Sequence, residues 1–203
     1  MKKTLILALV VITLFSISNF ATAQQFDAKV FAGLNLCQVD GDDDGSYNHP
    51  GLRAGVGTSF PLGDNRSPWR MVIELAYAQK GSHINSSDGE ISLQYIEVPL
   101  MLSYNMADNR LLVAAGVAPA VLSGAKVTFG GAESPTQAAK YKRMDWLPLT
   151  LSVGYRFTDH LVAEARYQNS LLTVYNGAGP YRLWTSNHGA FNRLLSFGLA
   201  YQF

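Results

Sequence analysis

The chain has 203 residues, of which 48% are hydrophobic and 15% charged, and its formal net charge is +1. This balance lacks the basic excess of a nucleic-acid-binding protein, so we expect no nucleic-acid partner. The charged fraction is low for a water-exposed surface, where about a quarter is usual, and the single cysteine, Cys37, excludes an intramolecular disulfide.

The first 23 residues have the pattern of a cleaved signal peptide. Two lysines precede an apolar run over residues 5–15, which is shorter than the ~20 residues of a membrane helix. Because small residues follow at Ala21 and Ala23, we expect cleavage after Ala23 and one mature domain over residues 24–203. Cleavage would remove two of the 16 basic side chains and leave 14 against 15 acidic ones.

Hydrophobic residues recur at every second position along most of the mature chain. Over residues 147–157, for example, the odd positions are apolar and the even positions are small or polar, which is typical of a strand with one apolar face. Strands of about 10 to 12 residues match a tilted crossing of a bilayer. We predict eight strands, over residues 26–36, 52–60, 69–80, 96–104, 111–122, 147–157, 161–168 and 195–203.

The predicted linkers alternate between long and short. Outer-membrane barrels have short periplasmic turns and longer external loops, so this alternation is what such a barrel requires. It places the four long linkers on one side and both chain ends on the other. The linkers cover residues 38–50, 61–68, 81–90, 105–110, 123–145, 158–160 and 171–190.

Charged residues occupy the polar positions of these strands, with nearly balanced signs. A soluble sandwich would bury its apolar face against a second sheet, whereas a closed barrel of eight strands lets inward charges pair across a narrow lumen. We therefore predict an all-β fold, an eight-stranded antiparallel up-and-down transmembrane β-barrel without an open pore. The predicted interior salt-bridge network comprises Arg53, Glu74, Glu97, Arg156, Glu164 and Arg166.

Aromatic residues gather near the strand ends, as in the interfacial girdles of membrane barrels. The predicted girdles contain Trp69 and Tyr104 on the turn side and Tyr77, Trp146, Tyr167 and Tyr175 on the loop side. The final strand ends on an aromatic residue, and its pattern resembles the C-terminal signal that the barrel-assembly machinery of bacterial outer membranes recognises. The residues of this predicted assembly signal are Gly198, Tyr201 and Phe203.

Five segments of the mature chain form a recognisable set: Gly33-Leu34-Asn35, "QVDGDDDGSYNHPGLRAGVG", "ELAYAQKGS", "LQYIEVPLMLSY" and "AAGVAPAVL". With them the chain resembles the PorT-family outer-membrane β-barrels of Bacteroidetes, and "YAQKG" and "YIEVPL" are the most specific pieces. The resemblance covers nearly all of the mature chain. It implies a barrel in the outer membrane of a Gram-negative bacterium, and the family's namesake is linked to secretion of surface proteins.

An acidic segment matches the start of a calcium-binding loop. Asp40, Asp42 and Asp44 occupy alternate positions and Gly45 follows, but Gly51 stands where a bidentate glutamate is needed. Two interpretations stay open, a solvated acidic loop and a calcium site. We expect no other cofactor.

The histidines leave an enzymatic alternative open. A triad of Ser82, His83 and Asp88 would make the protein a lipid-modifying hydrolase, although no nucleophile motif or metal-ligand spacing is present. The pair Glu74 and Glu97 is unsuited to acid catalysis because neighbouring arginines would keep both carboxylates ionised.

The long loops carry the remaining candidate binding groups. Lys126, Lys140, Lys142 and Arg143 could bind lipopolysaccharide phosphates, and loop tyrosines and Trp184 could contact a partner; an ordinary mobile loop is the alternative. We expect a non-enzymatic outer-membrane protein with a structural or interaction role through its external loops. Its expected partners are outer-membrane lipid, the barrel-assembly machinery and an extracellular or envelope protein. The lipid hydrolase and an accessory component of protein secretion are the alternatives.

Overall fold

The computed structural model describes residues 26–40, 47–64, 66–84, 88–106, 108, 110–176 and 190–203. The predicted signal peptide and parts of the predicted long loops, including Trp184, lie outside these described residues. None of the helices in the described part of the chain is long and apolar enough to cross a membrane.

Strands dominate the described structure, with one short helix at the loop end. The elements are β1 (Asp27–Asp40), β2 (His49–Pro61), β3 (Trp69–Ile84), β4 (Gly89–Glu97), β5 (Leu100–Met106), β6 (Leu111–Val117), β7 (Ala120–Phe129), β8 (Ala132–Glu133), α2 (Pro135–Ala138), β9 (Met144–Asp145), β10 (Pro148–Arg156), β11 (Leu161–Ser170) and β12 (Phe191–Gln202).

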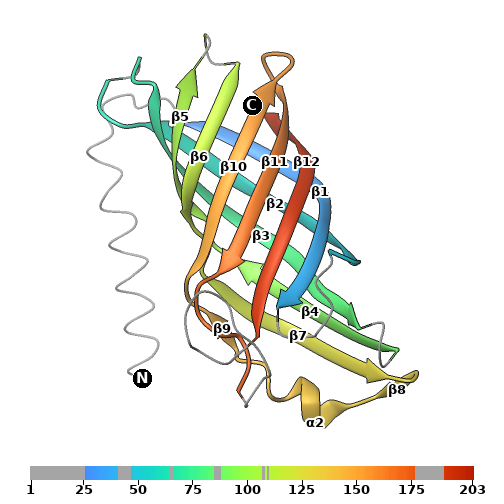
Figure 1. Ribbon diagram of the computed structural model, residues 1–203. Coiled ribbons are helices and arrows are strands. Elements are labelled where there is room, and N and C mark those ends of the chain that lie inside the picture. Colours follow the sequence, from blue (N-terminus) through green and yellow to red (C-terminus); the bar gives the residue numbers. More distant parts are fainter. Residues whose placement is uncertain are drawn as a thin grey trace, which may run out of the picture.

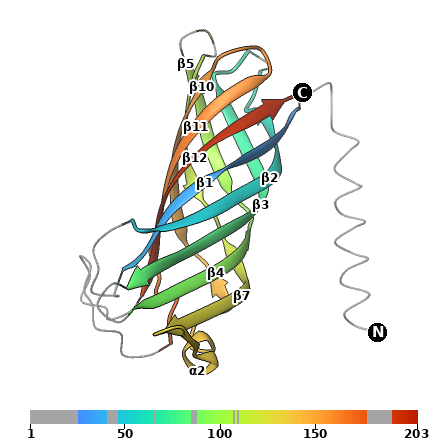
Figure 2. The same ribbon diagram turned by 90° about the vertical axis from the view of Figure 1, so that its right-hand side faces the viewer.

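The sheet closes on itself as a barrel (Figures 1 and 2). β4 continues into β5, β6 into β7, and β9 into β10, so these segments and the remaining long strands form eight spanning strands. Each pairs antiparallel with its neighbours in sequence, and β12 pairs with β1 along twelve residue pairs, which closes the barrel. The predicted eight-stranded antiparallel barrel is confirmed.

Prolines cause the three interruptions within the spanning strands. In a regular antiparallel ladder, every second pair of opposite residues exchanges two hydrogen bonds, but proline has no N–H and can only accept. Each proline therefore makes one bond with its neighbour where two would form, and we term this line of three positions the proline seam. The bonds run from Glu74 N to Pro99 O (3.0 Å), from Val98 N to Pro119 O (2.9 Å) and from Ala118 N to Pro148 O (2.9 Å).

The two faces of the wall differ as the alternation predicts. On β10, Leu149, Leu151 and Val153 are exposed on the outside, whereas Thr150 and Ser152 are buried within the lumen. Similar apolar side chains point outward on the neighbouring strands, so a continuous apolar band surrounds the barrel.

Strands extend further at the loop end than the sequence predicts. β3 runs to Ile84 and β4 begins at Gly89, within the loop predicted over residues 81–90. The predicted loop over residues 123–145 likewise contains most of β7, then β8, α2 and β9 (Figure 1). These corrections have one cause: backbone pairing continues above the lipid band, where an outward apolar face is no longer needed.

Candidate functional site in the lumen and at the loop end

One buried carboxylate binds three cations in the turn-side half of the lumen. Glu74 Oε1 lies 2.6 Å from Lys29 Nζ, and Glu74 Oε2 lies 2.6 Å from Arg53 Nη2. Arg166 donates to both oxygens of Glu74, at 2.9 and 3.0 Å. The small size of Gly57 allows this approach, because a Cβ there would lie 3.0 Å from Glu74 Cγ and 3.1 Å from Lys29 Cε.

A second carboxylate completes this group, which we term the Glu74 network. Glu164 Oε1 lies 2.7 Å from Arg166 Nη2, and longer contacts of 3.7 and 3.8 Å join Glu164 to Arg53 and Lys29. Three cations thus face two carboxylates from four different strands. Such a group is stable in a low-dielectric interior only when every charge keeps its partner.

The remaining two predicted members lie elsewhere. Glu97 belongs to a separate pair, and the Arg156 guanidinium donates to Gln202 Oε1 at 2.8 Å near the turn end. Among the described residues no ion pair joins Arg156 to the network, because Arg156 ends β10 while Arg166 lies deeper in the barrel.

The separate pair joins the two most specific segments of the PorT-family resemblance. Lys80 of "YAQKG" places Nζ 2.6 Å from Oε1 of Glu97 in "YIEVPL", and both side chains are buried. Lys80 Nζ also lies 4.9 Å from the ring centroid of Tyr95, and Gln168 Nε2 donates to Glu97 Oε1 at 3.2 Å. These motif residues therefore interact with each other inside the lumen.

A polar cluster that the sequence did not predict lies next to this pair. Ser170 Oγ donates to Asp145 Oδ2, and Asn192 Nδ2 lies 3.3 Å from Tyr95 Oη and 3.5 Å from Asp145 Oδ2. Trp146 and Leu147 are both exposed, so strict alternation breaks immediately after Asp145. The alternation therefore could not show that this aspartate faces inward.

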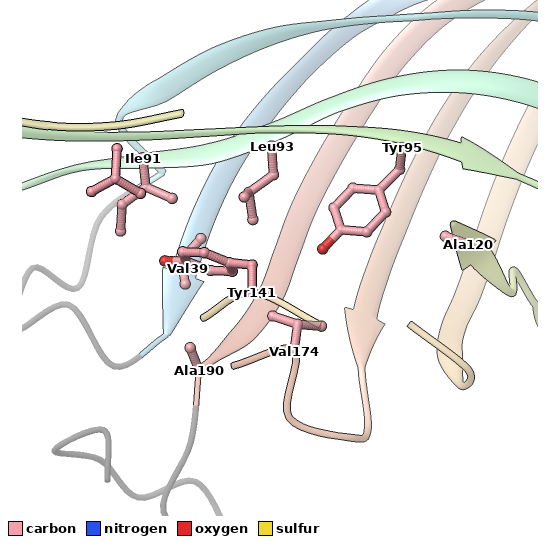
Figure 3. Close-up of a cluster of buried hydrophobic side chains, with 9 residues drawn as sticks. Val39, Ile91, Leu93, Tyr95, Ala120, Tyr141, Val174 and Ala190 are labelled. Atoms are coloured by element: carbon pink, nitrogen blue, oxygen red, sulfur yellow. The ribbon is translucent and has the colours of Figure 1, made fainter. Parts of the chain in front are cut away.

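Apolar side chains fill the loop-side half of the lumen (Figure 3). Leu93 and Tyr95 are fully buried there, and Tyr141 packs edge-to-face against Tyr175 with ring centroids 5.2 Å apart. Tyr175 was predicted in the girdle, but it packs against this cluster instead. We term the buried members the apolar plug: Val39, Ile91, Leu93, Tyr95, Ala120, Val127, Tyr141, Val174 and Ala190.

The remaining girdle residues are distributed over both ends of the barrel. Trp69 and Tyr104 pack edge-to-face on the turn side, with centroids 4.7 Å apart. Trp146 is 62% exposed at the loop side, while Tyr77 and Tyr167 are partly buried.

The predicted assembly signal lies on the last strand. Gly198 faces Gly33 at the β1–β12 closure, where an added Cβ would lie 2.6 Å from the Ala32 carbonyl oxygen. Tyr201 and Phe203 are exposed and pack edge-to-face, 5.2 Å apart. Close packing of β1 against β12 therefore requires a glycine at position 198. Recognition of the three-residue signal by the assembly machinery stays a prediction.

The described residues leave the calcium hypothesis open. The side chains of Asp40, Asp42 and Asp44 lie outside them. Within the described ranges, no group of three or more histidine, cysteine, aspartate or glutamate residues is placed to hold a metal ion.

The geometry does not bring Ser82 and His83 together as a catalytic pair. They are consecutive residues of β3, so their side chains project to opposite faces of the strand. Ser82 is fully buried on the lumen side, like Lys80. Asp88 lies in a turn with φ +45°.

The basic loop residues differ in their surroundings. Lys126 Nζ lies 2.7 Å from Glu133 Oε1 on the exposed β7–β8 hairpin, and this hydrogen-bonded partner raises the pKa of Lys126. Lys140 and Lys142 lie in a segment that pairs with residues 174–176, and Arg143 is exposed.

The closed wall and apolar exterior define a transmembrane β-barrel, and the comparisons specify the family. The model of the "outer membrane protein beta-barrel domain" matches residues 22–176, so the chain belongs to this family. The protein is located in the outer membrane. The comparison with curated proteins found no match.

The chain is also similar to solved structures, and one of them supports the same fold. The crystal structure of Ail, the attachment invasion locus protein of Yersinia pestis, has 12% sequence identity and a TM-score of 0.52, and the match covers 88% of this chain and 99% of Ail. Ail in complex with the heparin analogue sucrose octasulfate matches over the same shares with 12% identity and a TM-score of 0.46. A de novo designed transmembrane β-barrel matches with 12% identity and a TM-score of 0.43, covering 87% of this chain and 95% of the design.

Proposed function

We propose that this outer-membrane barrel acts as a non-enzymatic interaction protein that presents its loop end to an extracellular or envelope protein, and that it is not an open pore. The observation that carries the proposal is the filling of the lumen. The Glu74 network fills the turn-side half, the Lys80–Glu97 pair follows, and the apolar plug fills the lumen toward the loops. The cavity nearer the turn end holds only about 40 Å³.

The loop end supports this proposal because it is folded rather than a plain connection. The β7–β8 hairpin and α2 lie beyond the loop-side ends of β10 and β11 (Figure 1), and Tyr141 and Val174 anchor this region to the apolar plug. A rigid scaffold that presents such a surface is a common arrangement in binding proteins. Ail, which shares this fold, is the attachment invasion locus protein of Yersinia pestis.

Attachment of whole cells tests the proposal. Cells that produce the wild-type chain should attach to extracellular protein surfaces more than cells in which a short glycine–serine turn replaces residues 130–137. That variant keeps Tyr141 in the apolar plug, and heat-modifiable gel mobility would show that its barrel still folds. Equal attachment by both strains would contradict the interaction role, and a steady single-channel conductance of the wild type would contradict the closed lumen.

The narrower assignment to the PorT family, with an accessory role in secretion, is a second candidate. Its support is the resemblance of "YAQKG" and "YIEVPL", whose Lys80 and Glu97 meet in the lumen. This contact assigns both motifs a structural task, so they do not by themselves favour secretion. Unchanged secretion of surface proteins after deletion of the gene would reject this candidate.

A further inference from the structure

One side of β7 lacks a neighbouring strand over part of its length. β9 pairs with β7 only at Ala120 and Val121, and β8 pairs only at Thr128 and Phe129. β4 pairs with one side of β7 along its whole length. On the other side, the described residues place no strand between the two short pairings.

Two hydrogen bonds mark the ends of this open edge. Leu122 N donates to Arg143 O at 2.8 Å, and Ser134 N donates to Val127 O at 2.8 Å. The Val127 carbonyl therefore points away from β4. Since the N–H and C=O of one residue in an antiparallel strand point to the same side, and every second residue repeats this direction, Ala125 N–H, Ala125 O and Val127 N–H point to the open edge as well.

A groove of about 340 Å³ runs beside this edge, between β7 and the α2 segment. Its walls carry small apolar side chains, and the exposed Lys126–Glu133 pair lies at its rim. The residues that line the groove include Ala125, Val127, Ser134, Pro135, Ala138 and Ala139.

The groove lies above the lipid band. Trp146 is 62% exposed and directly follows β9, which pairs with the start of β7, so Ala125 lies on the loop side of this aromatic residue. Backbone groups without partners are too costly in hydrocarbon, which also places the open edge in water.

We propose that the open edge of β7 binds an extended segment of an extracellular polypeptide by strand addition. Only a polypeptide backbone offers donors and acceptors with the spacing that Ala125 and Val127 present, and this mode of recognition recurs at exposed sheet edges. Because small side chains line the groove, it favours a bound peptide with small apolar side chains that face the groove and polar ones that alternate with them at the rim. This inference rests on the proposed interaction role and names the chemistry of the partner.

Selection of linear peptides tests the proposal directly. A phage-displayed library of random linear peptides would be selected on the full barrel in lipid nanodiscs, and the affinities of the enriched peptides measured for wild type and variants. Ala125→Pro removes an N–H that the described fold does not use, and should weaken binding about tenfold, the value of roughly one hydrogen bond. Ala125→Ser keeps the N–H and serves as the matched control, and Ala139→Arg should block the groove from its other wall without touching β7.

Amide hydrogen exchange supplies a readout that does not depend on a proline variant. In the free protein, Ala125 and Val127 should exchange faster than Lys126, whose N–H points toward β4, and bound peptide should protect the first two. Enrichment of no peptide, or equal peptide affinity of wild type, Ala125→Pro and Ala139→Arg, would overturn the proposal. Concentration-dependent protection without peptide would also overturn it, in favour of a second copy of the chain. Peptide binding without cell attachment would instead contradict the proposed function alone.

Discussion

The two halves of the lumen are filled by different forces. On the turn side, Glu74 is held by Lys29, Arg53 and Arg166. On the loop side, Leu93 and the other members of the apolar plug pack through apolar contacts, and one of them, Tyr95, also borders the charged Lys80. In the charged half, each side chain needs an oppositely charged partner in a defined geometry. The loss of one member therefore leaves other charges buried without compensation. In the apolar half, side chains need only fill the available volume. A truncation there lowers the free energy of unfolding because contacts are lost and a cavity is left.

The largest expected effect follows from removing the shared carboxylate. Glu74→Ala leaves three buried cations facing Glu164 alone and should lower the free energy of unfolding by about 4 kcal/mol. Urea unfolding of the barrel in detergent micelles measures this, with Glu133→Ala at the exposed hairpin pair as the control. If Glu74→Ala does not fold, Glu74→Gln should give an intermediate loss. Equal stability of Glu74→Gln and wild type would show that the network's charges contribute nothing.

A smaller loss is expected from the second ion pair. Lys80→Met leaves Glu97 buried without its cation and should cost about 3 kcal/mol of unfolding free energy. The double variant Lys80→Met/Glu97→Leu should recover part of this loss, because no unpaired charge remains at the two positions. A double-mutant cycle from equilibrium unfolding gives the coupling. Strict additivity of the two single changes would refute a direct interaction.

Truncation in the apolar plug tests how much packing in the loop-side half contributes to stability. Leu93→Ala should lower the free energy of unfolding by about 3 kcal/mol, since it removes a fully buried side chain and leaves a cavity. Leu75→Ala on the lipid-facing side removes the same atoms without an enclosed cavity, and should cost less. The two variants are compared by urea unfolding under identical conditions; a larger loss for Leu75→Ala would contradict the packed interior.

The smallest effect is expected at the exposed pair on the hairpin. Lys126→Gln should leave the unfolding midpoint unchanged, because Lys126 and Glu133 are both solvent-exposed and such pairs contribute little. Thermal unfolding at low and high salt checks this. A clear midpoint shift would mean that this hairpin contributes to the stability of the whole barrel.

The sequence predicted the barrel well because lipid imposes a period of two on every spanning strand. It also indicated which charges face inward, and the structure brings Arg53, Glu74, Glu164 and Arg166 together. Which of these charges meet depends on the stagger between strands, and alternation carries no information about stagger. The pairing of Lys80 with Glu97, and the separate position of Arg156, therefore could not be predicted.

Local breaks in the pattern account for the other differences. Asp145 ends the loop predicted over residues 123–145, and the exposed Trp146 and Leu147 break the alternation that would show it facing inward. Loop residues such as Tyr141 and Val174 carry no periodic signal, so the sequence does not predict the apolar plug. The difference at the extended β4 has another cause: Ile91, Leu93 and Tyr95 alternate with polar residues, but they face the lumen instead of lipid, opposite to the phase of the spanning part.

The proline seam has a consequence for how the barrel comes apart. It crosses neighbouring strands from β3 to β10, and it begins at Glu74, the residue whose side chain reaches cations on β1, β2 and β11. Neighbouring strands thus share fewer backbone hydrogen bonds along the seam. At Glu74, where the seam begins, ion pairs connect strands from opposite sides of the barrel. Rupture along the seam would have to separate these ions at the same time, so we expect the two sides of the cylinder to melt in a single cooperative step.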